Sequence, residues 1–154
     1  MTHAAPDALV LFGATGDLAK KKIYPALQGL VRRGRLDVPV VGIARAGWDV
    51  DGMRRHVHES LEQSGSFDAE AAGQLARQMR YVDSDYTDPA TFEKLRKALG
   101  DAKRPLHYLA IPPSLFPTVV EGLGRSGTVV MGGNGSWRPS GKVAQAKLKS
   151  QVRA

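Results

Sequence analysis

Cysteine is absent from the 154 residues of this chain. Disulfide bonds, cysteine-ligated metal centres and thiol catalysis are therefore excluded. Long apolar runs are also missing, because none approaches the about 20 residues that a membrane-spanning helix requires, and the start of the chain lacks the charged lead of a cleavable signal. Since 42% of the residues are hydrophobic, we expect a soluble, cytoplasmic, globular protein with no membrane partner.

Acidic residues are absent from the last 28 positions. Residues 1–126 carry 17 basic and 15 acidic side chains, a net charge of +2, whereas residues 127–154 carry five basic side chains and none that is acidic. Basic proteins often bind nucleic acids. Trp137 is the only aromatic residue of the basic segment, and single-strand binding uses several aromatic side chains for stacking. We therefore expect no specific nucleic-acid partner.

Apolar segments alternate with helical patterns along most of the chain. Short apolar runs predict buried strands at 8–12, 38–44, 80–84 and 106–111, and the start of a fifth at 128–131. Apolar residues at helical spacing predict helices over 17–33, 49–80 with an interruption near 64–66, 88–99 and 114–123. This alternation predicts an α/β fold, a Rossmann-like parallel sheet with flanking helices.

Two details qualify this prediction. Pro25 lies inside the first helical segment, so we expect either a kink or two shorter helices with Pro25 near the start of the second. Residues 132–154 are rich in glycine and serine and keep no strand or helix period. We therefore divide the chain into a partial Rossmann-like domain, residues 1–131, and an irregular basic tail, residues 132–154. Because the tail replaces the rest of the domain, we expect an incomplete sheet.

A glycine turn, residues 13–19, follows the first predicted strand. In a strand–turn–helix unit, free backbone N–H groups and the positive end of the helix can hold a pyrophosphate. Gly13 would permit the tight turn, Gly16 the close approach of the phosphates, and Ala19 the packing of the helix on the sheet. The spacing Gly-x-x-Gly-x-x-Ala departs from the usual fingerprint, so a structural turn without a ligand is the alternative.

The second predicted strand ends at Arg45. A site for NAD usually has an acidic residue here, whereas arginine suits the 2′-phosphate of NADP, with which it can form a bidentate pair. The sequence therefore favours NADP over NAD. A solvated surface arginine is the alternative.

Four segments together resemble the glucose-6-phosphate dehydrogenase family: residues 11–27 (LFGATGDLAKKKIYPAL), 42–45 (GIAR), 81–88 (YVDSDYTD) and 107–116 (HYLAIPPSLF). The resemblance covers about residues 8–126. It implies oxidation of glucose 6-phosphate to 6-phosphogluconolactone with reduction of NADP, a reaction of the pentose phosphate pathway. The cofactor-binding residues that it implies are Gly13, Ala14, Thr15, Gly16, Asp17, Leu18, Ala19, Lys20, Arg45, Asp85, Tyr86, Pro112 and Phe116.

These residues have different implied roles. By the resemblance, residues 13–20 would wrap the pyrophosphate and Arg45 would pair with the 2′-phosphate. Asp85 and Tyr86 would border the adenine. Pro112 and Phe116 would line the nicotinamide end of the cofactor. The family can have tyrosine at the position of Phe116, so the resemblance implies only the packing of the ring there.

The chain departs from the family after the fifth predicted strand. The family continues with Glu-Lys-Pro-Phe-Gly, but residues 132–137 read GGNGSW, and the later sugar-phosphate segment and catalytic histidine are missing. We therefore expect the NADP-binding portion of a truncated enzyme, inactive alone, whose full-length form takes glucose 6-phosphate. A frameshift near residues 127–131 is one origin for the unrelated tail. In that case, one of the other two reading frames of the coding DNA would encode Glu-Lys-Pro-Phe-Gly or a close variant. The alternative function is a stand-alone NADP-binding regulatory or redox-sensing module.

The histidines provide no general base that we can defend. His56 and His58 are expected to point to different faces of a helix, away from the glycine turn, and His107 to be packed or edge-exposed on the fourth strand. We predict no catalytic pair and no metal site. An incomplete sheet would also expose apolar surface and a strand edge, which favours self-association.

Overall fold

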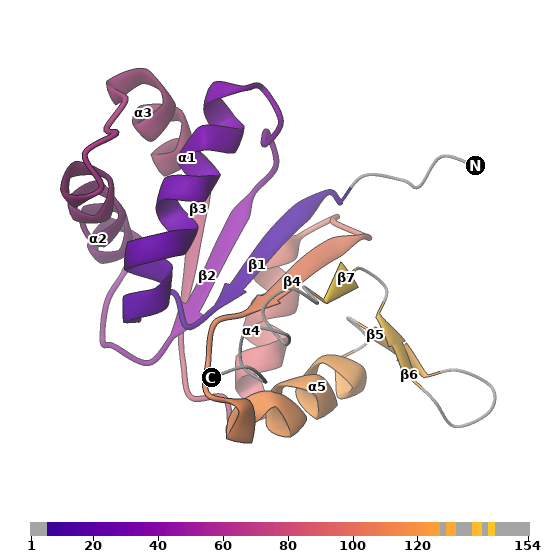
Figure 1. Cartoon of the computed structure of the whole chain (residues 1–154). Coiled ribbons are helices and arrows are strands. Elements are labelled where there is room, and N and C mark those ends of the chain that lie inside the picture. The colour runs from indigo at the N-terminus through magenta and orange to yellow at the C-terminus, as the bar shows by residue number, and fades with distance from the viewer. Residues whose placement is uncertain (1–5, 127–128, 132–136, 140–141, 144–154) are drawn as a thin grey trace.

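The computed structural model describes residues 6–126, 129–131, 137–139 and 142–143. Its centre is a parallel sheet in the order β3-β2-β1-β4-β7, with helices on both faces (Figure 1). The strands of this sheet are β1 Ala8–Phe12, β2 Val40–Ala44, β3 Met79–Asp83, β4 Pro105–Leu109 and β7 Lys142–Val143. The helices are η1 Ala19–Ile23, α1 Tyr24–Arg32, α2 Val50–Gln63, α3 Ala69–Gln78, α4 Ala90–Leu99, η2 Pro113–Leu115 and α5 Phe116–Arg125.

Strand β1 is buried along its whole length because helices cover both of its faces. Its side chains alternate between two apolar cores, as the pleat of a strand requires. Leu9 and Leu11 face the core that contains α1, α2 and α3. Val10 and Phe12 face the core that contains α4 and α5. The predicted α/β fold with a parallel, doubly covered sheet is confirmed.

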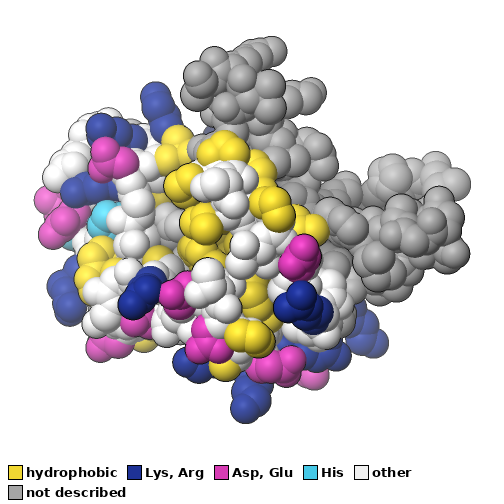
Figure 2. All heavy atoms as spheres, turned by 90° about the horizontal axis from the view of Figure 1, so that it is seen from below, with side chains coloured by type: hydrophobic (Ala, Val, Ile, Leu, Met, Phe, Trp, Pro, Cys, Tyr) yellow, Lys and Arg dark blue, Asp and Glu magenta, His cyan; other side chains and the backbone are white. Residues whose placement is uncertain are grey.

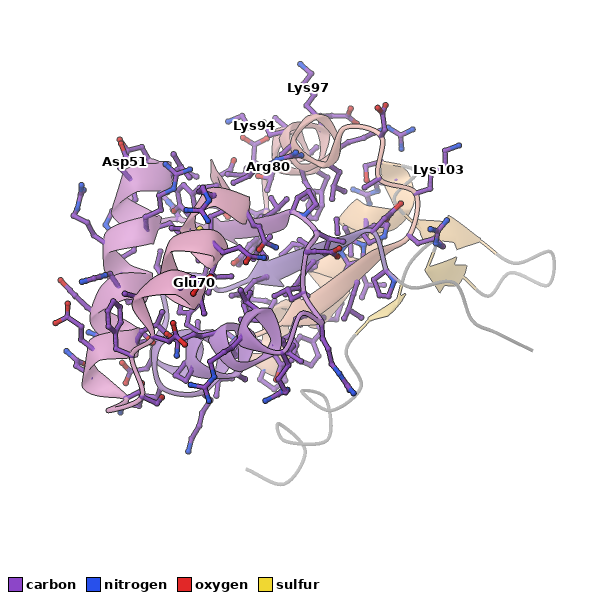
Figure 3. The ribbon with its side chains drawn as sticks, turned by 90° about the horizontal axis from the view of Figure 1, so that it is seen from above. Asp51, Glu70, Arg80, Lys94, Lys97 and Lys103 are labelled. Atoms are coloured by element: carbon purple, nitrogen blue, oxygen red, sulfur yellow. The ribbon has the colours of Figure 1, made fainter. Side chains whose placement is uncertain are left out.

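The charged side chains lie on the outside of these layers. Lys94 and Lys97 extend from α4 away from the sheet, and Asp51 and Glu70 lie on α2 and α3 (Figure 3). All four residues are exposed. Acidic and basic groups are thus both present on the helical surface, in keeping with the nearly neutral charge of residues 1–126.

The first helical segment consists of two helices, and this selects between the two alternatives for Pro25. Pro25 lies in the first turn of α1, where its missing N–H costs no hydrogen bond. The preceding η1 is a π-helical turn in which the N–H of Tyr24 donates to the carbonyl of Ala19. The carbonyl of Lys20 accepts a hydrogen bond from the Ser60 hydroxyl on α2, so this irregular turn is held by the neighbouring helix.

The end of the chain differs from the expected continuation of the sheet. Strand β5, Val129–Met131, forms as predicted, and Thr128 lies outside the described residues. Strand β5 pairs antiparallel with β6, Trp137–Pro139, in a separate two-stranded sheet. Strand β7 pairs parallel with β4. Strands β6 and β7 lie in the segment expected to be irregular. Runs of two or three residues are too short to show a strand period.

Candidate cofactor-binding site

The candidate site lies where the parallel strands end. The order β3-β2-β1-β4 means that the chain first builds the sheet outward from β1 and then returns to the other side of β1. In open α/β sheets, ligands bind outside the carboxyl ends of the strands at this reversal. Figure 2 views the molecule from this end, where hydrophobic side chains gather near the middle and charged side chains surround them.

The glycine turn follows β1 at the reversal. Gly13 has φ +85°, and a Cβ atom there would lie 2.1 Å from the carbonyl oxygen of Ala110, so both conformation and space require glycine. The N–H groups of Gly13 and Ala14 donate to the carbonyl of Ile43 at 2.9 and 3.2 Å. The turn is therefore held against the ends of both β2 and β4.

The rest of the turn presents free donors. Gly16 and Asp17 are exposed. The backbone N–H groups of Thr15, Asp17 and Leu18 have no acceptor within the part of the chain that the structure describes. Such outward N–H groups before a helix form an anion-binding arrangement. The geometry therefore favours a phosphate-binding turn over a purely structural turn, in which all of these N–H groups would be hydrogen-bonded within the chain.

Two tyrosines support the turn, Tyr24 fully buried and Tyr86 partly buried. The Tyr86 hydroxyl accepts the N–H of Gly13 at 2.7 Å and donates to the carbonyl of Ile43 at 3.0 Å. Burial raises the pKa of Tyr86 to about 12, which keeps the hydroxyl protonated. The Tyr24 hydroxyl donates to the carbonyl of Ala14 at 2.5 Å, and burial raises its pKa too. The resemblance implied contact with adenine for Tyr86, and the structure adds this supporting role.

Arg45 and Asp85 form an ion pair beside the turn. Nη1 of Arg45 lies 2.8 Å from Oδ2 of Asp85, and the Arg45 side chain is 77% exposed. The backbone N–H and hydroxyl of Thr87 donate to the other carboxylate oxygen, and these bonds, together with the charge of Arg45, lower the pKa of Asp85. Guanidinium has five N–H donors. Arg45 can therefore bind a phosphate without losing Asp85.

Asp83 is a supporting residue that the sequence interpretation missed. Its carboxylate accepts the N–H groups of Ala46 and Gly47 at 2.9 and 3.0 Å and the Tyr81 hydroxyl at 2.6 Å. Burial raises the pKa of Asp83, but these hydrogen bonds outweigh it and lower the pKa. Asp83 thus fixes the turn that follows Arg45. The available signal was the two-residue spacing of Tyr81 and Asp83 on one face of a strand.

His56 lies close to the glycine turn, so the prediction that it points away is wrong. Its ring centroid is 5.1 Å from that of Trp48 and 6.1 Å from that of Tyr24. The charge of Lys20 and the carbonyl of Gly16 both affect its pKa. The physical reason is its position three residues after the buried Met53, on the inner face of α2.

The segment after β4 completes the edge. Pro112 is exposed and precedes η2, and Phe116 is half-buried at the start of α5, where it packs against the α4–α5 core. The N–H of Ala110 donates to the carbonyl of Phe12 at 2.9 Å. The structure therefore places all the predicted cofactor residues on the loops and helix starts that follow β1, β2, β3 and β4.

Other chemical groups offer less. Of the two alternatives for His107, packed or edge-exposed, the structure shows the packed one, and burial lowers its pKa to about 4. Over the described ranges, no group of three or more His, Asp or Glu side chains could hold a metal ion. No helix of these ranges is long and apolar enough to cross a membrane.

Comparison with known proteins agrees with this geometry. The family model described as glucose-6-phosphate dehydrogenase, NAD binding domain, matches residues 10–138. The chain belongs to the glucose-6-phosphate dehydrogenase family. Glucose-6-phosphate 1-dehydrogenase 1 of Mycobacterium bovis is 39% identical over 119 residues, which are 77% of this chain and 26% of that protein.

Solved structures of the family give the same result. The glucose-6-phosphate 1-dehydrogenase from Mycobacterium avium superimposes with a TM-score of 0.75 and 37% identity, over 79% of this chain and 27% of that one. A glucose-6-phosphate dehydrogenase in complex with its substrate glucose 6-phosphate gives a TM-score of 0.69 and 29% identity, over 80% and 29%. The chain thus spans about a quarter of the length of these relatives.

Proposed function

We propose that this chain is the NADP-binding portion of a glucose-6-phosphate dehydrogenase. The full-length enzyme would oxidise glucose 6-phosphate to 6-phosphogluconolactone and reduce NADP, and this portion alone would be inactive. The observation that carries the proposal is the glycine turn, whose free N–H groups lie beside an exposed arginine at the end of β2. Family membership supports the same cofactor class.

The residues present fit NADP. The N–H groups of Thr15, Asp17 and Leu18 would hold the pyrophosphate, and the remaining donors of Arg45 would bind the 2′-phosphate. Asp85, bonded to Arg45 at 2.8 Å, would keep the guanidinium at the adenosine end. When bound, NADP would accept a hydride from the sugar at its nicotinamide ring, which we place on the Pro112 side.

Catalysis requires a general base, to which we assign no histidine of the described residues. A general base must reach the sugar hydroxyl within about 3 Å. In the described part of the chain, His107 is fully buried and His58 lies exposed on α2. We assign neither a catalytic role. The substrate site for glucose 6-phosphate would therefore depend on the full-length protein.

The role of Arg45 can be tested by calorimetry. We expect Arg45→Ala to weaken NADP binding about 10- to 100-fold, since a hydrogen-bonded charge contributes roughly 1.5–3 kcal/mol. Binding of NAD, which lacks the 2′-phosphate, should change little. Arg77→Ala, an exposed arginine on α3, is the matched control. An equal loss for NADP and NAD, or no loss, would contradict the assignment.

We also propose that the chain self-associates through one face of the sheet. A groove of about 440 Å³ lies between α1 and β4 and is lined mainly by apolar side chains. Leu106 and Tyr108 of β4 are only half-buried there. A second copy that covers these side chains would remove apolar surface from water, which is favourable at roughly 25 cal/mol per Å².

A further inference from the structure

The side chain of His56, on the inner face of α2, lies next to the glycine turn. Its ring packs against Trp48, and the Tyr24 ring meets it edge-on. Its Nε2 atom is buried and has no hydrogen-bond partner among the described residues. Tyr24 itself supports the turn through the carbonyl of Ala14. An imidazole with an unused nitrogen therefore lies next to the glycine turn, whose Gly16 backbone it contacts.

The charges around His56 come from three elements. Lys20 faces it from η1, Asp17 from the turn, and Glu59 from its own helix, with the neutral Tyr24 on α1. Lys20 and Glu59 also form an ion pair of 3.8 Å. Burial and the charge of Lys20 lower the pKa of His56, whereas Glu59, the Gly16 carbonyl and Asp17 raise it. The net effect is downward, so His56 is neutral in the free protein near pH 7.

Bound phosphates would change this balance. An anion on the turn neutralises the effect of Lys20, and its own negative charge favours the imidazolium. Burial opposes a charge on the unpaired nitrogen, so His56 takes up a proton only where the attraction of the bound phosphates exceeds this desolvation cost. Ligand binding that raises a pKa must take up protons, and the affinity must then rise as the pH falls.

We propose that His56 is a proton-linked positioning residue, which becomes protonated when the phosphates of NADP bind and which strengthens their binding. This inference rests on the proposed function, because it requires that the glycine turn hold NADP. His56 would act through its charge and would not contact the reacting atoms.

Calorimetry of NADP binding in buffers of different ionisation enthalpy tests the inference. The dependence of the observed enthalpy on the buffer gives the number of protons taken up. At pH 7 we expect uptake of a fraction of a proton by the unmodified chain, and about a 3- to 10-fold gain in affinity from pH 8 to pH 6, by the rule of tenfold per unit of pKa change. His56→Gln should remove most of both effects.

Two controls separate other sources of protons. His58→Gln, on the exposed face of α2, should keep the uptake of the unmodified chain. The 2′-phosphate itself titrates near pH 6, as phosphate monoesters do, so NAD serves as the matched ligand without that group. Uptake that depends on His56 with both NADP and NAD assigns the effect to the pyrophosphate, whereas uptake with NADP alone assigns it to the 2′-phosphate.

The outcomes are distinct. Proton uptake that is unchanged in His56→Gln overturns the inference and leaves the proposed function standing. A uniform loss of affinity at every pH also overturns it, because that result indicates a packing role. Failure of the unmodified chain to bind NADP overturns the proposed function and the inference together. NMR titration of the imidazole should show directly that NADP raises the pKa of His56.

Discussion

Replacing His107 with leucine should remove much of the acid sensitivity of the folded chain. His107 lies in β4 with no exposed surface, and neither ring nitrogen has a hydrogen-bond partner among the described residues. Its ring packs 6.1 Å from that of Phe12. Burial lowers its pKa from 6.5 to about 4. The native state therefore keeps this imidazole neutral over a range in which the unfolded chain binds a proton.

The sign and size of the effect follow from this difference. Above pH 6.5 the ring is neutral in both states and costs nothing through titration. As the pH falls from 6.5 towards 4, only the unfolded state is protonated, and the free energy of unfolding decreases. At 1.36 kcal/mol per pKa unit, the total loss is about 3 kcal/mol, most of it reached by pH 4.5. The leucine variant lacks this loss and should also be more stable at pH 7, since two unpaired buried nitrogens disappear.

Urea unfolding followed by circular dichroism at pH 7.5, 6.5, 5.5 and 4.5 measures the difference. Subtracting the unmodified chain from His107→Leu cancels the carboxylates and His56, which titrate in both. With a slope of roughly 1–3 kcal/mol per M urea, the advantage of the variant should grow by about 1–3 M in midpoint between pH 7.5 and 4.5. His58→Gln should show no such growth. Parallel pH profiles for the unmodified chain and His107→Leu would refute the buried neutral imidazole.

Two further predictions concern the turn and the apolar groove. Gly13→Ala should lower the free energy of unfolding by several kcal/mol and abolish NADP binding, because its Cβ would overlap the carbonyl of Ala110; Gly34→Ala, also at positive φ but with nothing within 4 Å, should cost only about 1 kcal/mol. Leu106→Glu in the groove should convert associated chains to monomers by light scattering, whereas Lys97→Glu on the outer surface of α4 should not; a monomeric unmodified chain would contradict self-association.

Local patterns in the sequence predicted those features that depend on local geometry. The buried run at 8–12 predicted β1 because a strand covered on both faces must be apolar throughout. Pro25 predicted a break because the lack of an N–H acts within one helical turn. The position of Arg45 directly after β2 was predicted because the run of apolar residues ends there, and its role in binding a phosphate stays a prediction. Each of these inferences needs only the neighbouring residues.

Contacts between distant segments could not be predicted in this way. Tyr86 supports Gly13 from 73 positions away, and no spacing rule joins them. His56 shows how a partial rule misleads: its two-residue separation from His58 correctly placed the pair on different faces, but choosing the inner face required Met53, three residues earlier.

The requirement for glycine at position 13 shows where sequence reasoning ends. Its spacing suggested a tight turn, but the stronger constraint is the carbonyl of Ala110, which lies beside it because Phe12 pairs with Leu109 in the register of β1 and β4. That register exists only if β4 adjoins β1. Alternating strands and helices predict a parallel sheet without fixing its strand order. The same order that places β4 beside β1 also creates the reversal at which the glycine turn lies. The candidate site and its most restrictive contact therefore both follow from a single property of the fold, the position of β4.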